Sequence, residues 1–178
     1  MLRGVVLNGT GLFLPLAVED ADSVTLEDSV VVGGSNKVAP GGGCVSITSR
    51  SSVALRRLSI RDCRALGREG SGGAVFVNAT AGVVVLEDVS VTDGTLNAFT
   101  GAGGCVSLHG VKVTLDRVDV KRCAAKGLTS SGCLHINGDV PQSTATIPNS
   151  SATITNSLLE NGACRGACGP RARRRRMW

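Results

Sequence analysis

A short motif that returns about every 30 residues constrains this chain more than any other feature. In each copy a glycine step, Gly-Gly or Ser-Gly, leads into a short apolar strand, which we call the first strand. Its four copies are Gly43–Ile47, Gly73–Val77, Gly104–Leu108 and Gly132–Ile136. A second apolar segment has five copies, at Val24–Val31, Val53–Ile60, Val84–Val91, Val113–Val120 and Ala152–Leu159. Such a repeat indicates a stack of units that cannot bury their apolar faces alone.

The composition favours strands and tight turns over helices. The 178 residues include 24 Gly, three Phe and no Tyr, and 42% of them are apolar while 19% are charged. A core without aromatic bulk is built from Val, Leu, Ile and Ala in thin layers, and glycines between apolar runs mark turns. The length and the apolar content suit one domain with a continuous core and exclude a disordered chain.

Alternation within the second segment predicts the shape of one coil, meaning one circuit of the chain. Val84 and Leu86 face inward and Val89 and Val91 face inward again, with two polar residues between the pairs. Two polar residues between strands of the same phase predict a corner, so we expect three short strands in each coil. Three-sided coils that stack in parallel form a parallel β-helix, and the preferred hand of parallel connections makes it right-handed.

The predicted fold class is therefore all-β, a right-handed parallel β-helix solenoid of about five coils with roughly 30 residues each. A leucine-rich horseshoe would need a Leu/Asn consensus that is missing, and a β-sandwich would not require so regular a repeat. We expect residues 1–19 to form an incomplete first coil or an N-terminal cap, residues 20–164 the repeats, and residues 165–178 a basic, disordered tail. Unpaired strand edges at the two ends would allow end-to-end self-association.

The parity of the first strand predicts which of its two faces is buried. One parity is apolar in every copy and is expected to face the core: Val45, Val75, Val106 and Leu134, with Ile47, Val77, Leu108 and Ile136. The other parity is expected to line the outer surface: Cys44, Ala74, Cys105 and Cys133, with Ser46, Phe76, Ser107 and His135. Equivalent positions in neighbouring coils lie about 4.8 Å apart, so each position forms a row along the stack.

The corner residues form two rows in which the sign of the charge mostly alternates. One row reads Asp28, Arg57, Asp88, Arg117 and Asn156, and its neighbour reads Glu27, Arg56, Glu87, Asp116 and Thr155. Opposite charges across neighbouring strands stabilise their pairing, whereas a slip by one coil would bring like charges together. We interpret these corner rows as structural devices that fix the register, in preference to a binding role.

These motifs resemble two known groups of repeat proteins. The Gly-Gly-(Ala/Cys) steps before an apolar strand, and Thr-Asn-Ser-Leu-Leu-Glu-Asn at residues 155–161, resemble the right-handed β-helix repeats of the pectate-lyase-like superfamily. The glycine steps are also similar to the Gly-Gly-Ala repeats of chlamydial polymorphic outer-membrane proteins. The second motif of those proteins, an aromatic residue followed three residues later by Asn, is degraded here. The resemblance, which covers about residues 20–162, implies the fold and leaves the family open.

Polysaccharide cleavage is the activity that this resemblance suggests. A lyase would need calcium-binding carboxylates and a basic residue on one outer face, and a hydrolase would need a pair of carboxylates. The outer parity of the first strand carries neither, because acidic residues such as Asp62 and Asp93 lie at corners or strand ends. His135 could act as a general base, but we interpret it as a lone surface histidine. No catalytic, cofactor-binding or metal-binding residue is predicted.

The seven cysteines leave two interpretations open. Cys105 and Cys133 occupy the same position in adjacent coils, so their backbones should be close enough for a disulfide. Cys44 stands two coils from Cys105, with Ala74 between them, and Cys63 and Cys123 are likewise separated by Gly94. Cys164 and Cys168 form a local pair, too few ligands for a zinc site. We expect small, half-buried thiols in rows, or one or two disulfides if the chain is secreted.

The remaining signals concern location and partners. Five arginines within residues 171–176 produce most of the net charge of +5, so the repeats are nearly neutral and no specific nucleic-acid surface is expected. That tail is either a nuclear-import or polyanion-binding patch or a solvated end. Residues 1–17 loosely resemble a signal peptide, but Gly11–Leu16 can equally form another strand of the repeat. No stretch is apolar enough to span a bilayer. Three glycosylation sequons, at Asn8, Asn78 and Asn149, the last two expected in turns or loops, favour export.

We therefore expect a non-catalytic β-helical segment of a longer chain, extracellular or at a cell surface, with a role in adhesion or glycan contact. Two alternatives remain. The first is a carbohydrate-active enzyme, a lyase or hydrolase, whose active residues lie elsewhere or in the stretch at 138–150. The second is a structural spacer without any ligand. No cofactor is expected in any of the three cases.

Overall fold

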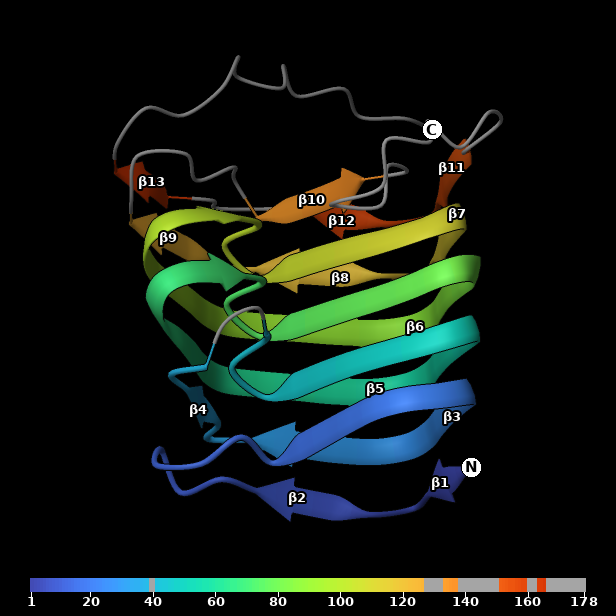
Figure 1. Ribbon diagram of the computed structural model, residues 1–178, viewed down its shortest axis with the longest axis horizontal. Coiled ribbons are helices and arrows are strands. Elements are labelled where there is room, and N and C mark those ends of the chain that lie inside the picture. The colour runs from blue at the N-terminus through green and yellow to red at the C-terminus, as the bar shows by residue number, and fades with distance from the viewer. Residues whose placement is uncertain (39–40, 127–132, 138–150, 160–162, 166–178) are drawn as a thin grey trace.

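The computed structural model describes residues 1–38, 41–126, 133–137, 151–159 and 163–165, which wind into a parallel β-solenoid (Figure 1). The described residues make about four coils of about 29 residues each, against the expected five of roughly 30. All strand pairs among them are parallel, and none of these residues lies in a helix. The strands are β1 (Leu2–Arg3), β2 (Val6–Asn8), β3 (Leu16–Val32), β4 (Ser35–Asn36), β5 (Val45–Ser71), β6 (Val75–Ala102), β7 (Val106–Asp116), β8 (Asp119–Lys121), β9 (Ala124–Lys126), β10 (Leu134–Asn137), β11 (Ser151–Thr155), β12 (Leu158–Leu159) and β13 (Ala163–Arg165).

The rows predicted along the stack are confirmed by the strand register. Val45 pairs with Val75, Val75 with Val106, and Val106 with Leu134, so these four form one row. The second segments also align, with the row Val24, Val53, Val84, Val113 and Ala152. Because parallel pairing repeats the same contact in every coil, each coil covers the open edge of the coil before it.

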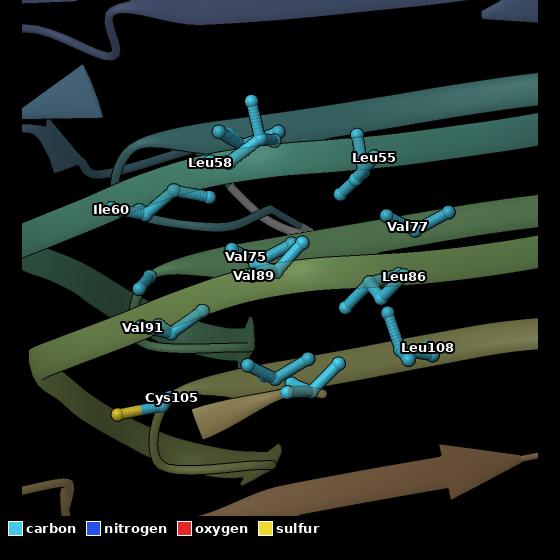
Figure 2. Packing of buried hydrophobic residues seen from close by; sticks show 14 of the residues in the cluster. Leu55, Leu58, Ile60, Val75, Val77, Leu86, Val89, Val91, Cys105 and Leu108 are labelled. Carbon is cyan, nitrogen blue, oxygen red and sulfur yellow. The ribbon is translucent and has the colours of Figure 1, made fainter. Parts of the chain in front are cut away.

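The main core lies between the first strand and the second segment of each coil. The inner-parity residues of the first strand are fully buried in the central coils, while Leu134 and Ile136 in the last described coil are half-buried. Figure 2 shows Leu55, Val77, Leu86 and Leu108 packed in successive layers, with Leu58, Val75 and Val89 forming a second group beside them. The inward parity predicted from the sequence is therefore confirmed.

The polar corner in the second segment is made by one residue with a left-handed backbone. That residue is Asp28, Arg57, Asp88, Arg117 or Asn156 in successive coils, each with φ between 48° and 54°. The left-handed residue turns the chain sharply and is itself skipped in the pairing, which resumes directly after Asp28, Arg57 and Asp88, so the strands on both sides stay in the same phase. A second left-handed row, which contains Asp62, Asp93 and Arg122, turns the chain again five residues later.

A fourth strand segment follows that second corner, so the expectation of three strands per coil is wrong. It consists of β4, residues 64–71 of β5, residues 95–102 of β6, and β9. Its small side core contains Ala65, Leu96, Ala98 and Ala125. This segment lacks the alternation of large apolar residues that marks the other strands, so its sequence resembles a loop.

The glycine pair permits the first strand to pass directly beside this fourth segment. A methyl group at Gly73 would lie 2.1 Å from the oxygen of Gly104 and 2.6 Å from the carbonyl carbon of Thr95. No side chain fits at such distances, since both neighbours are backbone atoms. The recurring Gly-Gly step therefore reflects a close approach of two backbones.

The boundaries expected for the chain are described only in part. Residues 2–3 and 6–8 pair in parallel with β3, and residues 16–18 pair in parallel with β5. Residues 138–150 and most of the basic tail lie outside the described residues.

Candidate functional site

The face of the first strand opposite the core was expected to be exposed, and that expectation is wrong. Cys44, Ala74 and Cys105 are fully buried, Phe76 is 4% exposed and Ser107 is 0% exposed. The first three are enclosed because the fourth segment passes beside the start of the strand. Ser107 is covered in a second way, because in its row it lies between the larger residues Phe76 and His135.

This buried face carries a polar cluster, formed by Asn78, Ser107, His109 and His135, which we call the histidine cluster. The Ser107 Oγ lies 3.1 Å from Nε2 of His109, whose side chain is 7% exposed. The Nδ1 atom of His109 and the Oδ1 atom of Asn78 are buried without a hydrogen-bond partner among the described residues. Asn78 and His109 are direct partners in neighbouring strands. The two unpaired buried atoms therefore belong to adjacent positions of one face.

His135 belongs to this cluster and is not the lone surface histidine that the sequence suggested. Its ring centroid lies 5.8 Å from that of His109, and the ring of Phe76 lies 5.6 Å from His109 on the other side. The pKa of His109 is lowered to about 4, mainly by burial and to a smaller degree by the neighbouring His135. Burial also lowers the pKa of His135. Both imidazoles are therefore neutral at pH 7.

His109 was not predicted as a site residue because the repeated motif covers only five residues of each first strand and ends at Leu108. Ser107 and His109 are two residues apart, so strict alternation places them on the same face. Extending the strand by one residue beyond Leu108, well within β7, would have placed His109 on the same face as Ser107, in the neighbourhood of His135.

The chemistry open to this cluster is limited by its burial. A serine beside a histidine is the start of a nucleophile–base pair, but such a pair needs an accessible oxygen and a group that orients the base. The Ser107 side chain has no exposed surface, and no carboxylate accompanies His109 in its described contacts. The described residues also contain no group of three or more His, Cys, Asp or Glu side chains that could hold a metal ion.

The corner rows carry a network of ion pairs between neighbouring coils. Arg57 donates to both carboxylate oxygens of Asp28, and Arg117 donates to both of Asp88, at 3.0 Å for its second contact. Arg56 lies between Glu27, at 3.3 Å, and Glu87, at 3.4 Å. The alternating ion pairs predicted from the sequence are confirmed for these coils.

The rows depart from strict alternation at Asp116, which pairs with Glu87 in the register. Arg117 resolves the conflict, because it contacts Glu87 at 2.9 Å and also contacts Asp88 and Asp116. Thr155 and Asn156 donate to Asp116 from the next coil, and these two hydrogen bonds lower the pKa of its carboxyl. Arg57 similarly lowers the pKa of Asp28 to about 2.

Five of the seven cysteines occupy two neighbouring rows where the first strand passes the fourth segment. The start row, just before each first strand, contains Cys44, Ala74, Cys105 and Cys133, and the end row, just after the second corner, contains Gly34, Cys63, Gly94 and Cys123. Disulfides join the rows, as Cys44–Cys63 and Cys105–Cys123. The expected contact within the start row, Cys105 with Cys133, is therefore not the one used, because the sequence did not reveal that the end row lies alongside. Cys133 is a buried thiol.

One of the three sequons, at Asn78, has different surroundings from those expected. Asn78 lies inside β6 and pairs with Thr48 and His109, so the prediction of a turn or loop there is wrong. Asn8 lies at the end of β2 and is exposed, and Asn149 is outside the described residues.

Comparison of the chain with family models, with curated proteins and with solved structures finds no match in any of the three. The structure therefore supports the parallel β-solenoid that the resemblance implies, and none of the three comparisons supports either group of repeat proteins. No helix in the described ranges could cross a membrane.

Proposed function

We propose that this chain is an exported, non-catalytic β-solenoid segment whose corner rows contact glycans at a cell surface, in addition to the register-fixing role that their sequence indicates. The observation that carries the proposal is the set of bidentate ion pairs along these rows, in which Arg57 and Arg117 are each held by carboxylates of the coil before. Planar guanidinium, carboxylate and amide groups are the side chains that hydrogen-bond a hydroxyl-rich ligand with defined geometry. Here they are fixed on a rigid scaffold at a repeat of about 4.8 Å per coil.

Export is supported by the two disulfides, since disulfides persist in oxidising compartments and are rare in the cytosol. The protein should therefore show these pairings when it is isolated from its native source. Extraction into an alkylating agent, followed by non-reducing peptide mapping, measures them directly. Recovery of Cys44 and Cys63 as alkylated thiols would contradict export.

A glycan array tests the contact surface. We expect binding by the full chain that persists when residues 171–178 are removed, because the corner rows are unchanged. The double variant Arg57→Gln and Arg117→Gln should lose that binding and keep its β-sheet circular dichroism. Arg122→Gln, which breaks the pair with Asp93 at the other corner, is the matched control. Binding that vanishes with the arginine tail would reduce the contact to nonspecific charge attraction.

A carbohydrate-active enzyme is the second candidate, and the histidine cluster is the observation that favours it. Assays on polygalacturonate and other uronic-acid polymers with calcium present test this activity. Turnover that is lost in His135→Ala would replace our proposal by the enzymatic one. A chain with neither turnover nor glycan binding would be a structural spacer.

A further inference from the structure

The two disulfides have different neighbours in the next coil. End-row Cys63 is followed along the stack by start-row Ala74, whereas end-row Cys123 is followed by start-row Cys133. The second disulfide therefore has a third sulfur beside it, and the first has a methyl group in the equivalent place.

Each start-row residue lies against two end-row residues, one in its own coil and one in the coil before. Cys44 is bonded to Cys63, and a methyl group at Gly34, in the coil before, would lie 2.6 Å from the Cys44 Sγ. Cys105 is bonded to Cys123, and a methyl group at Gly94 would also lie 2.6 Å from its Sγ. Glycine thus occupies the preceding end-row position for both bonded cysteines.

Cys133 is the case in which that preceding position is a cysteine. Because the coils repeat, Cys123 occupies the same position relative to Cys133 that Gly94 occupies relative to Cys105. Two contacts agree with this placement: the Cys133 thiol forms a hydrogen bond with the backbone of Cys123, and the Cys105 N–H donates to the Cys133 carbonyl over 3.0 Å. Cys123 therefore lies within reach of two sulfurs, one on each side along the stack.

We propose that Cys133 exchanges with the Cys105–Cys123 disulfide, so that the chain interconverts between two pairings that share Cys123. The Cys133 thiolate attacks the Sγ of Cys123, a Cys123–Cys133 bond forms, and the Cys105–Cys123 bond breaks. Cys105 leaves as a thiolate and takes up the proton that Cys133 released. The number of disulfides is unchanged, so the step requires neither an oxidant nor a reductant.

The exchange moves the cross-link along the stack. In the first pairing the bond spans 18 residues and joins a first strand to the end row of its own coil. In the second pairing it ties the start of β10 to the coil before it and releases the start of β7. Burial raises the pKa of Cys133, so little thiolate is present at pH 7 and the exchange accelerates as the pH rises.

Thiol mapping on the full chain tests the exchange. Samples incubated at pH 7 and pH 8 are quenched in acid, alkylated and digested with trypsin, which places Cys105 in the peptide of residues 69–112 and Cys133 in that of residues 127–165. We expect alkylation of Cys105 to grow with time while that of Cys133 falls equally, about tenfold faster at pH 8 than at pH 7. Complete alkylation of Cys133 with none at Cys105, at every time and pH, would overturn the proposal.

Two variants exchange the neighbouring residue, alanine or cysteine, between the two disulfides. Cys133→Ala gives the second disulfide the alanine neighbour that the first has in Ala74, and it should abolish alkylation of Cys105. Alkylation of Cys105 that persists in this variant would also overturn the proposal, because another thiol would then be the attacking group. Ala74→Cys places a thiol beside Cys63 and should bring alkylation to Cys44. If Ala74→Cys folds and Cys44 stays protected from alkylation, a thiol at this position of the start row does not attack the neighbouring disulfide, which contradicts the proposal. If Ala74→Cys does not fold, comparison of the wild type with Cys133→Ala still tests the proposal.

Discussion

The two faces of each first strand are buried by different means. The inner face, exemplified by Val75 and Leu108, packs against apolar side chains of the second segment. The opposite face is enclosed by disulfides at its start and, further along, by the mutually tilted rings of Phe76 and His109 and by the side chain of Ser107. Apolar packing depends mainly on volume, whereas disulfides and buried hydrogen bonds depend on particular atoms. The inner face should therefore tolerate exchanges between apolar residues of similar size, whereas the opposite face should not tolerate loss of its particular polar and sulfur atoms; removal of a large side chain should cost both faces alike.

Truncation of one large side chain on each face gives the largest expected effect. We expect Phe76→Ala and Leu108→Ala each to lower the free energy of unfolding by about 3 kcal/mol, because both leave a cavity in a buried site. Urea unfolding followed by circular dichroism measures both. Phe99→Ala is the control, because Phe99 is 63% exposed and its loss should change little. A cost for Phe76→Ala as small as that of Phe99→Ala would mean that the opposite face is exposed after all.

The inner face was predictable from the sequence because burial between two apolar layers leaves a regular alternation. Val45, Ile47, Leu55 and Leu58 each lie where their parity placed them. The charge rows were predictable for a similar reason, since the residues at Arg57 and Asp88 recur at one position of the repeat.

The opposite face could not be predicted, since what covers it leaves little trace in the sequence. The fourth segment packs through Ala65, Ala98 and glycines, and its close approach at Gly73 is visible only as the absence of a side chain. Without that segment, nothing indicated that Cys44 would meet Cys63. The histidine cluster depended on the length of a strand, which sequence patterns define poorly.

Loss of a disulfide is the next effect in size, and it distinguishes the two bonds. Cys44→Ala opens a cross-link across 19 residues and should lower the free energy of unfolding by about 3 kcal/mol, through the greater freedom of the unfolded chain. Cys105→Ala should cost less, because Cys123 can then pair with Cys133. Chemical unfolding of both variants without reductant compares them. Equal costs, with Cys123 recovered as a thiol, would show that Cys133 is not an alternative partner.

Acid should destabilise the opposite face through His109. Its pKa is about 4 in the folded chain and 6.5 in the unfolded chain, so between these values the unfolded state binds more protons. Stability is therefore lost as the pH falls from 6.5 towards 4, by on the order of 1–2 kcal/mol once partial solvent screening is allowed for. Unfolding curves between pH 7 and pH 4.5 measure this loss. His109→Gln should flatten the profile, and an unchanged slope would assign the loss to other groups.

The corner rows should give the smallest effect of any region, because their side chains are exposed and screened by salt. Arg57→Gln removes the two contacts with Asp28 and should lower the melting temperature by only about 1–2 °C, less still in 1 M salt. The carboxyl of Asp28 has a pKa of about 2 in the folded chain, below its unfolded value of 3.8, so the pair stabilises the fold above pH 4 and loses that effect as the pH falls towards 2. The difference in melting temperature between the wild type and Arg57→Gln should accordingly shrink from pH 7 to pH 2.5. A difference that persists in acid and in high salt would mean that Arg57 stabilises the corner through packing of its aliphatic stem, and the corner rows would then resemble the buried faces instead of contrasting with them.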